Sequence, residues 1–348
     1  MTLIFRNGRR NVPLCIISKM NGAAAVLVTG SHGFIGRHTA RHFARHGHLV
    51  FGIGHGGWKQ EEWRTWGLSD WREADLSIEA LEAYDRPFSA IVHCAGGASV
   101  QFSLDEPFED FHRTVESTIN VLEYIRRRAP DCRLVYPSSA GVYGAVETLP
   151  IREDAKCAPI SPYGVHKRMA EELIASYARQ YGMAASVVRF FSVYGAGLRK
   201  QLLWDACRKL SNGDSLFMGT GDEVRDWVHV DDATELLRLA AANANPACPI
   251  ANGGTGEGLR VREILAHVSN RLRAPPPVFS AISKKGDPLS YVADASQAAR
   301  WGWIPNADWR EKTAEYVAWW QLEMGIDTAA APRKRSAQTG AASASAGN

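Results

Sequence analysis

Short apolar runs alternate with segments of helical periodicity along the first 190 residues of this chain. Residues 24–28 are entirely apolar, and residues 34–46 follow with a helical pattern. Buried parallel strands read as continuous apolar runs, and each needs a crossover, usually a helix, before the next strand. The alternation therefore predicts an α/β fold with a parallel sheet. Further strands are expected at residues 48–54, 89–95 and 134–144, with a third strand that closes at residues 75–76.

A glycine-rich turn joins the first apolar run to the first helical segment. Residues Val26–Gly36 read Val-Leu-Val-Thr-Gly-Ser-His-Gly-Phe-Ile-Gly. Glycine lets a backbone approach a pyrophosphate closely, and the following helix start supplies free N–H groups and a partial positive charge. The turn predicts a dinucleotide cradle in a doubly wound Rossmann sheet, formed by Gly30, Gly33, Phe34, Ile35 and Gly36.

The second strand ends without the carboxylate that dinucleotide folds usually place against the adenosine ribose. Gly54 stands at that position, and His55 and Lys59 follow. A missing carboxylate removes repulsion toward a 2′-phosphate, and nearby cationic groups could bind one. This favours NADP as the cofactor, with NAD as the alternative.

The ends of the next strands supply further candidates for cofactor contacts. Asp75 and Leu76 close the third strand and could lie near the adenine ring. Ala95 follows the fourth strand with two glycines, which lets a flat cofactor lie close to the backbone. Ser138 and Ser139 end the fifth strand, at the sheet edge where ligands gather in open parallel sheets.

Tyr163 and Lys167 lie one helical turn apart in the segment Ser161–Lys167. A tyrosine has an ordinary pKa of about 10, too high for proton transfer at neutral pH. A lysine at i+4 lies on the same helix face, and its charge is expected to favour the phenolate. Ser139 can then hydrogen-bond a substrate oxygen while Tyr163 gives or takes its proton. Tyr163 and Lys167 are also expected to contact the cofactor.

These motifs together resemble the extended short-chain dehydrogenases/reductases of the nucleotide-sugar epimerase/dehydratase family. The resemblance covers about residues 23–325 and implies Ser139, Tyr163 and Lys167 as a catalytic triad. The matching segments are Thr29–Gly36, Ser138–Gly144, Ser161–Lys167, Arg189–Gly195 and Arg225–Asp232.

The resemblance also implies a substrate site and a homodimer. Arg225 would bind the substrate diphosphate, as suits a guanidinium, and the segment around Ser192 would line the sugar-nucleotide pocket, to which Ser138 is also assigned. Lys284 stands where many members carry an arginine on the diphosphate. The dimer would pack helices at about 109–128 and 164–181 into a four-helix bundle.

Departures from the family pattern narrow the reaction. Dehydratases of the family carry an Asp-Glu pair after the catalytic hydroxyl residue, where this chain has Ala140 and Gly141. Without that acid and base, elimination of water has no evident catalyst. The leading hypothesis is NADPH-dependent reduction of a 4-keto nucleotide sugar for surface polysaccharide precursors. The alternative is a UDP-sugar 4-epimerase with tightly bound NAD. A non-catalytic dinucleotide-binding scaffold or sensor would have no need of the triad.

Four segments are expected along the chain: an extension at 1–22, a dinucleotide-binding domain at 23–190, a smaller C-terminal α/β substrate-binding domain at 191–326, and a disordered tail at 327–348. Strands near Arg225–Val230 and Pro249–Ala251 are expected to return to the main sheet. Residues 1–19 are predicted to be dispensable, with an extra edge strand at Val12–Ser18 as the alternative.

Composition narrows the partners further. A net charge of +3, spread evenly, gives no sign of nucleic-acid binding, and no apolar run reaches the ~18–20 residues of a membrane span. Six cysteines without paired spacing favour a reducing cytoplasm. His38, His42 and His46 lie at i, i+4 and i+8 and could bind metal, but an exposed helix face is preferred, so no metal site is predicted. The predicted partners are a nucleoside-diphosphate sugar and a second copy of the chain.

Overall fold

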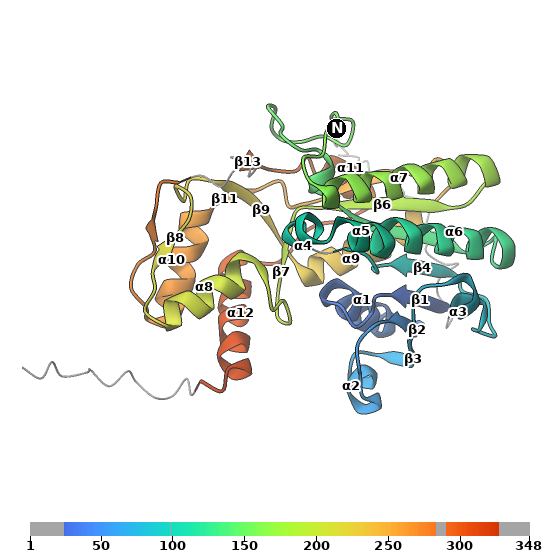
Figure 1. The fold of residues 1–348 in the computed structure, drawn as a ribbon, viewed down its shortest axis with the longest axis horizontal. Coiled ribbons are helices and arrows are strands. Elements are labelled where there is room, and N and C mark those ends of the chain that lie inside the picture. The colour runs from blue at the N-terminus through green and yellow to red at the C-terminus, as the bar shows by residue number, and fades with distance from the viewer. Residues whose placement is uncertain (1–23, 98, 283–289, 327–348) are drawn as a thin grey trace, which may run out of the picture.

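A seven-stranded parallel sheet forms the centre of the molecule in the computed structural model, which describes residues 24–97, 99–282 and 290–326 (Figure 1). Its strand order is β10-β6-β5-β4-β1-β2-β3, so the chain runs outward from β1 in one direction and from β4 in the other. The predicted doubly wound α/β fold is confirmed. The strands are β1 (Ala25–Thr29), β2 (Leu49–Gly54), β3 (Leu68–Glu73), β4 (Ala90–His93), β5 (Arg133–Ser139), β6 (Ala185–Phe190) and β10 (Ile250–Gly253).

Helices cover both faces of this sheet because successive residues of a strand point to opposite sides. In β1, Val26 belongs to the core under one group of helices and Leu27 to the core under the other. The first group is α1 (Phe34–Arg45), α2 (Gln60–Thr65), α9 (Val230–Asn243) and α11 (Ser296–Arg300). The second is α3 (Ile78–Glu82), α6 (Ser117–Arg128) and α7 (Pro162–Tyr181).

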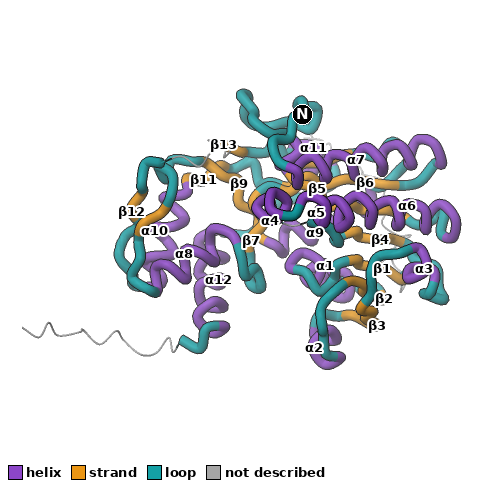
Figure 2. Tube along the Cα trace, in the orientation of Figure 1, coloured by secondary structure: helices purple, strands orange, loops and turns teal. Residues whose placement is uncertain are grey.

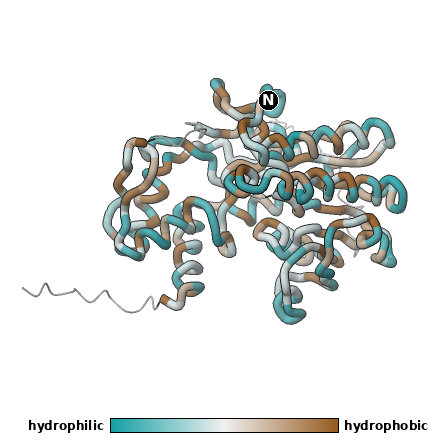
Figure 3. The backbone as a smooth tube through the Cα atoms, viewed as in Figure 1, coloured by the Kyte–Doolittle hydropathy of each residue, from teal (hydrophilic) through white to brown (hydrophobic). Residues whose placement is uncertain are grey.

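Helices α6 and α7 lie side by side on the second face (Figure 1). Hydrophobic and hydrophilic residues alternate along both of them, as expected when one side of a helix packs on a sheet (Figure 3). The short helices α4 (Val100–Asp105) and α5 (Pro107–Phe111) and a π-helical turn, His112–Glu116, precede α6.

A second, smaller part holds short strands and helices (Figure 2). One sheet contains β7 (Ser192–Tyr194), β9 (Val224–His229), β11 (Gly258–Arg260) and β13 (Ser290–Tyr291), and β8 (Leu216–Phe217) pairs with β12 (Val278–Phe279). Helices α8 (Gln201–Ser211), α10 (Val261–Leu272) and α12 (Trp309–Glu323) pack around a separate core that includes Leu203, Leu265 and Trp320.

One strand expected in the main sheet lies elsewhere. Residues 250–253 return to it as β10, beside β6, but β9 does not. Strand β9 pairs with β7, β11 and β13, so its backbone hydrogen bonds are made within the small sheet. Helix α9 then carries the chain back to the main sheet, so the segment 191–326 contributes to both parts.

The expected extension at 1–22 and tail at 327–348 lie outside the described residues. Among the helices that the structure does describe, none has the length and apolar character needed to cross a lipid bilayer.

Candidate active site

The glycine-rich turn between β1 and α1 leaves no room for a side chain at Gly30 or Gly36. Gly30 has a φ of +63°, and a Cβ there would lie 2.7 Å from the backbone nitrogen of Ala95. A Cβ on Gly36 would lie 2.2 Å from the carbonyl oxygen of Gly30. Gly33 caps α1 with no side-chain hydrogen bond, so the first N–H groups of this helix face outward without a side-chain acceptor. These features fit the pyrophosphate of a dinucleotide.

The ends of β1 and β4 meet at the point where the strand order reverses. The backbone N–H of Ala95 donates to Oγ1 of Thr29 over 3.1 Å, which holds the loop after β4 against the glycine turn. Such a reversal point is where open α/β sheets bind ligands. Of the other cradle residues, Ile35 packs into the core beneath α1, whereas Phe34 packs against the core of the smaller part.

Strand β2 ends at Gly54, where the backbone leaves little room for a side chain. Gly54 has a φ of +154°, and a Cβ there would lie 3.3 Å from Cα of Gly30 and 3.5 Å from the ring of Trp71. A carboxylate at position 54 would therefore strain the backbone and crowd the glycine turn. His55 and Asp75, both exposed, form an ion pair of 2.9 Å between Nε2 and Oδ1. Leu76 packs against the core of the second helix group.

Ser139, Tyr163 and Lys167 come together at the ends of β5 and α7. The hydroxyl of Ser139 accepts a hydrogen bond of 3.1 Å from the N–H of Gly141 and also bonds to Tyr163. Ser161 caps the N-terminus of α7, and its hydroxyl accepts a hydrogen bond of 3.2 Å from the N–H of Gly164. Nζ of Lys167 lies 6.0 Å from the centre of the Tyr163 ring. The structure thus brings the three predicted catalytic residues to one place.

The pKa of Tyr163 is not lowered, although the sequence predicted that Lys167 would favour the phenolate. Burial raises the pKa of Tyr163; the hydrogen bond with Ser139 offsets part of this rise, and the negative charge of Asp110 adds to it. Burial also lowers the pKa of Lys167 to about 8, against the opposing effects of Cys94, Asp110 and Glu171. The raised pKa of Tyr163 means that burial, and not the charge of the i+4 lysine, decides the acidity of this phenol in the protein alone.

The turn after Ser139 is pressed against the start of α7. A Cβ on Gly164 would lie 2.6 Å from the carbonyl oxygen of Gly141, and a Cβ on Gly141 would lie 3.6 Å from the Tyr163 ring. Gly164 therefore allows the start of α7 to pack on this turn, which brings Tyr163 beside Ser139. Neither Ala140 nor Gly141 has a side chain that could act as an acid or a base on a substrate.

The hydroxyl of Ser138, a predicted substrate contact, belongs to a buried hydrogen-bond network in the protein alone, and its substrate role stays a prediction. Its hydroxyl donates to Oε1 of Glu171 over 2.6 Å. Arg189 donates to both oxygens of Glu171 and to the hydroxyl of Tyr143. Since the side chain of Ser138 alternates with that of Ser139 along β5, the two hydroxyls point to opposite sides.

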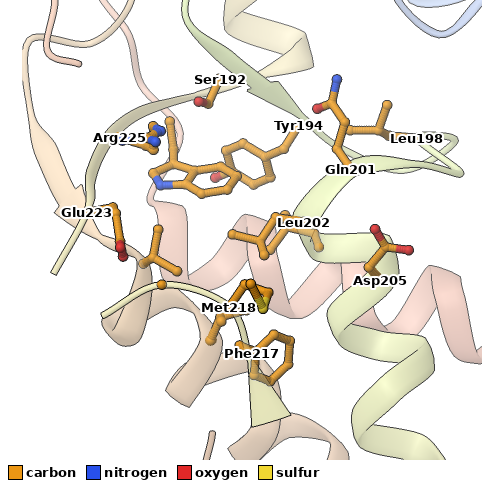
Figure 4. Close-up of a pocket in the computed structure, with 15 residues that line it drawn as sticks. Ser192, Tyr194, Leu198, Gln201, Leu202, Asp205, Phe217, Met218, Glu223 and Arg225 are labelled. Carbon is orange, nitrogen blue, oxygen red and sulfur yellow. The ribbon is translucent and has the colours of Figure 1, made fainter. Parts of the chain in front are cut away.

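A pocket opens in the smaller part, beside β7 and β9 (Figure 4). It contains Ser192 and Arg225, as the resemblance implies. The guanidinium of Arg225 donates to the carbonyl oxygen of Val224 over 2.9 Å. Aromatic and apolar side chains form the rest of the wall, including Tyr194, Leu202, Phe217, Met218 and Trp227, and Gln201, Asp205 and Glu223 add polar groups.

The sequence did not predict most of the residues that line this pocket. Phe217, Met218 and Trp227 lie in a segment of short strands whose periodicity is too brief to show which side chains are exposed. Trp227 has one local signal, its place between Arg225 and His229 in a motif already noted. Lys284, the remaining predicted substrate residue, lies outside the described residues.

The sequence profile of the NAD-dependent epimerase/dehydratase family matches residues 26–251. The chain belongs to this family of enzymes. The UDP-glucose 4-epimerase of Azospirillum brasilense is 29% identical over 286 residues, which are 75% of this chain and 82% of that relative.

Solved structures of family members share the fold. The UDP-glucose 4-epimerase of Thermotoga maritima with UDP-glucose has a TM-score of 0.78 at 26% identity, over 86% of this chain and 99% of its own. The UDP-glucose 4-epimerase of Thermus thermophilus with NAD has a TM-score of 0.76 at 28% identity, over 85% of this chain and 99% of its own. These relatives match the epimerase alternative and give no support to the NADPH-dependent reductase.

Proposed function

We propose that this protein is an NAD-dependent 4-epimerase of UDP-sugars. The observation that carries the proposal is the meeting of Ser139, Tyr163 and Lys167 at the strand ends beside the glycine turn, with no acid or base at positions 140 and 141. This set suits proton and hydride transfer at a hydroxyl-bearing carbon and leaves water elimination without a catalyst. Relatives named as UDP-glucose 4-epimerases, aligned over most of their length, support carbon 4 as that centre.

Each catalytic residue has a role in this reaction. Tyr163 would take the proton of the 4-hydroxyl group while Ser139 hydrogen-bonds the same oxygen, and Tyr163 would return the proton when the opposite configuration forms. Bound NAD supplies the hydride acceptor and, for the return, the hydride donor. Lys167 would add positive charge near the developing phenolate, and its own burial strengthens that charge effect.

The pocket in the smaller part would hold the UDP group. Arg225 offers a guanidinium suited to phosphate oxygens, and the aromatic rings of Phe217 and Trp227 offer surfaces for a base. Lys284 stays a prediction as a second phosphate ligand.

A second candidate, NADPH-dependent reduction of a 4-keto nucleotide sugar, rests on Gly54. The strain that a side chain would meet at that position means that no carboxylate can bind the ribose there. The neighbouring His55 is exposed and could face a 2′-phosphate, although its ion pair with Asp75 places a carboxylate close by.

The bound cofactor separates the two candidates. Purified protein would be denatured, its released dinucleotide identified by chromatography, and UDP-glucose and UDP-galactose assayed for interconversion without added cofactor. We expect stoichiometric NAD and interconversion. Release of NADP, or turnover only with added NADPH and a 4-keto sugar, would support the reductase instead.

His55→Asp is a better probe of cofactor choice than a change at Gly54, because it adds a carboxylate at an exposed position. It should weaken NADP binding in a reductase.

We also propose a homodimer formed through α6 and α7. A role in surface polysaccharide precursors and a cytoplasmic location stay predictions.

A further inference from the structure

Three side chains that commonly ligate metals meet between α1 and α9, outside the candidate active site. His42 and His46 lie one turn apart on α1, with ring centres 4.4 Å apart. Glu235 reaches across from α9, and its Oε2 lies 2.8 Å from Nε2 of His42. One ligand atom from each of the three residues lies within 4.8 Å of the other two.

His38 does not share this site, although the i, i+4, i+8 spacing suggested one exposed face for all three histidines. It is buried, and its Nε2 is hydrogen-bonded to the carbonyl oxygen of Ala196 over 2.9 Å. A helix has 3.6 residues per turn, so positions eight apart are rotated by about 80°. His38 therefore faces the loop after β7, while His42 and His46 face α9.

The surroundings orient the ligands. Nδ1 of His46 is hydrogen-bonded to the carbonyl oxygen of His42 over 2.9 Å, which leaves one nitrogen of this ring for a metal. Arg238 donates to Oε1 of Glu235 over 2.6 Å and to Oε2 over 2.9 Å. The bond to Oε1 can persist when Oε2 turns toward an ion, as for other metal-ligating carboxylates that hold a second hydrogen bond.

Two imidazoles and one carboxylate suit borderline transition metals such as zinc, at about 2.0–2.2 Å from each ligand. His42, His46 and Glu235 are at least partly exposed, so they can close by the small distance that such contacts require.

We propose that His42, His46 and Glu235 form a binding site for a divalent transition-metal ion that links α1 to α9. Helix α1 begins at the glycine turn, and α9 brings the chain back from the smaller part to the main sheet. The ion would thus brace the cofactor-binding helix against the segment that returns from the substrate side. This site is independent of the proposed epimerase reaction.

The test is titration of the full chain, without a polyhistidine tag, with Zn²⁺ against a chromophoric chelator. We expect one ion per chain, a rise in melting temperature of a few degrees, and at least a tenfold loss of affinity in His42→Ala and in His46→Ala. His112→Ala is the matched control, because His112 also pairs with a carboxylate, Glu116, one turn away, but has no third ligand among the described residues. It should leave the affinity unchanged.

Two results would overturn the proposal. One is the absence of stoichiometric Zn²⁺ binding to the folded protein. The other is binding that His112→Ala weakens as much as His42→Ala and His46→Ala do, which would show adventitious capture by surface histidines. If His42→Ala fails to fold, Glu235→Gln provides the same test from α9, since an amide oxygen is a much weaker ligand for zinc.

Discussion

Lys167 and Pro137 are joined by a hydrogen bond of 3.2 Å from Nζ to the carbonyl oxygen, within the buried core of the candidate active site. The contact holds Nζ beneath the ring of Tyr163 and beside the ring of Tyr136, 4.8 Å from its centre. A cation at this depth is poorly solvated, so catalysis and stability make opposite demands on Lys167.

The first prediction is a pH-dependent stability change in Lys167→Met. The unfolded chain keeps the lysine proton up to the ordinary pKa of about 10.5, whereas the native chain loses it near 8, so between these values the unfolded state binds more protons. Wild-type stability therefore gains from rising pH across this window. Relative to wild type, Lys167→Met should be most favoured below about pH 8, by at most a few kcal/mol, and the advantage should shrink toward about pH 10.

Urea denaturation at both ends of this window measures the difference. A free-energy difference between variant and wild type that does not change with pH would show that Lys167 is not destabilised by burial.

The second prediction is that Tyr163→Phe abolishes turnover while dinucleotide affinity stays within a few-fold. The substitution removes only the hydroxyl proposed to exchange the substrate proton, and the glycine turn proposed to hold the cofactor lies elsewhere, between β1 and α1. Tyr181→Phe, at an exposed tyrosine on the same helix, is the control and should remain active. Activity retained in Tyr163→Phe would remove this residue from the mechanism.

The third prediction concerns a buried pair beside the site. Asp110 is fully buried, and its Oδ2 lies 2.6 Å from Nδ1 of His166. Asp110→Ala should lower the free energy of unfolding by about 3–5 kcal/mol, because it leaves His166 buried without its partner. Asp154→Ala, which removes an exposed ion pair with Arg152, should change stability little. Equal effects of the two variants in denaturant unfolding would contradict the argument.

The fourth prediction is dissociation of the proposed homodimer by Met169→Asp. Met169 and Val165 are partly exposed apolar residues on α7, and a charge placed between two such helices would be costly to bury. We expect a dimer for wild type and a monomer for the variant in sedimentation at micromolar concentration. Ile304→Asp, at a more exposed apolar residue away from α6 and α7, should stay dimeric. A monomeric wild type would end the dimer proposal.

The sequence by itself predicted those elements and residue spacings that are determined within a short stretch of chain. The apolar run before Gly30 and the glycine spacing after it predict β1, the turn and α1, because strand burial, backbone clearance and helix start are all set within about 20 residues. The spacing of Tyr163 and Lys167 is likewise a property of one helix. Ala140 and Gly141 argue against a dehydratase, because neither side chain offers an acid or a base.

Only the tertiary structure decided which distant residues meet. The pairing of β9 with β7, β11 and β13 could not be derived from the apolar pattern of β9, since a short strand offers the same hydrogen bonds to any sheet edge. The hydroxyl of Ser138 bonds to Glu171, because buried Arg189 places that carboxylate beneath β5. Glu235 faces His42 across 193 residues of sequence, and only the packing of α9 on α1 brings the two together.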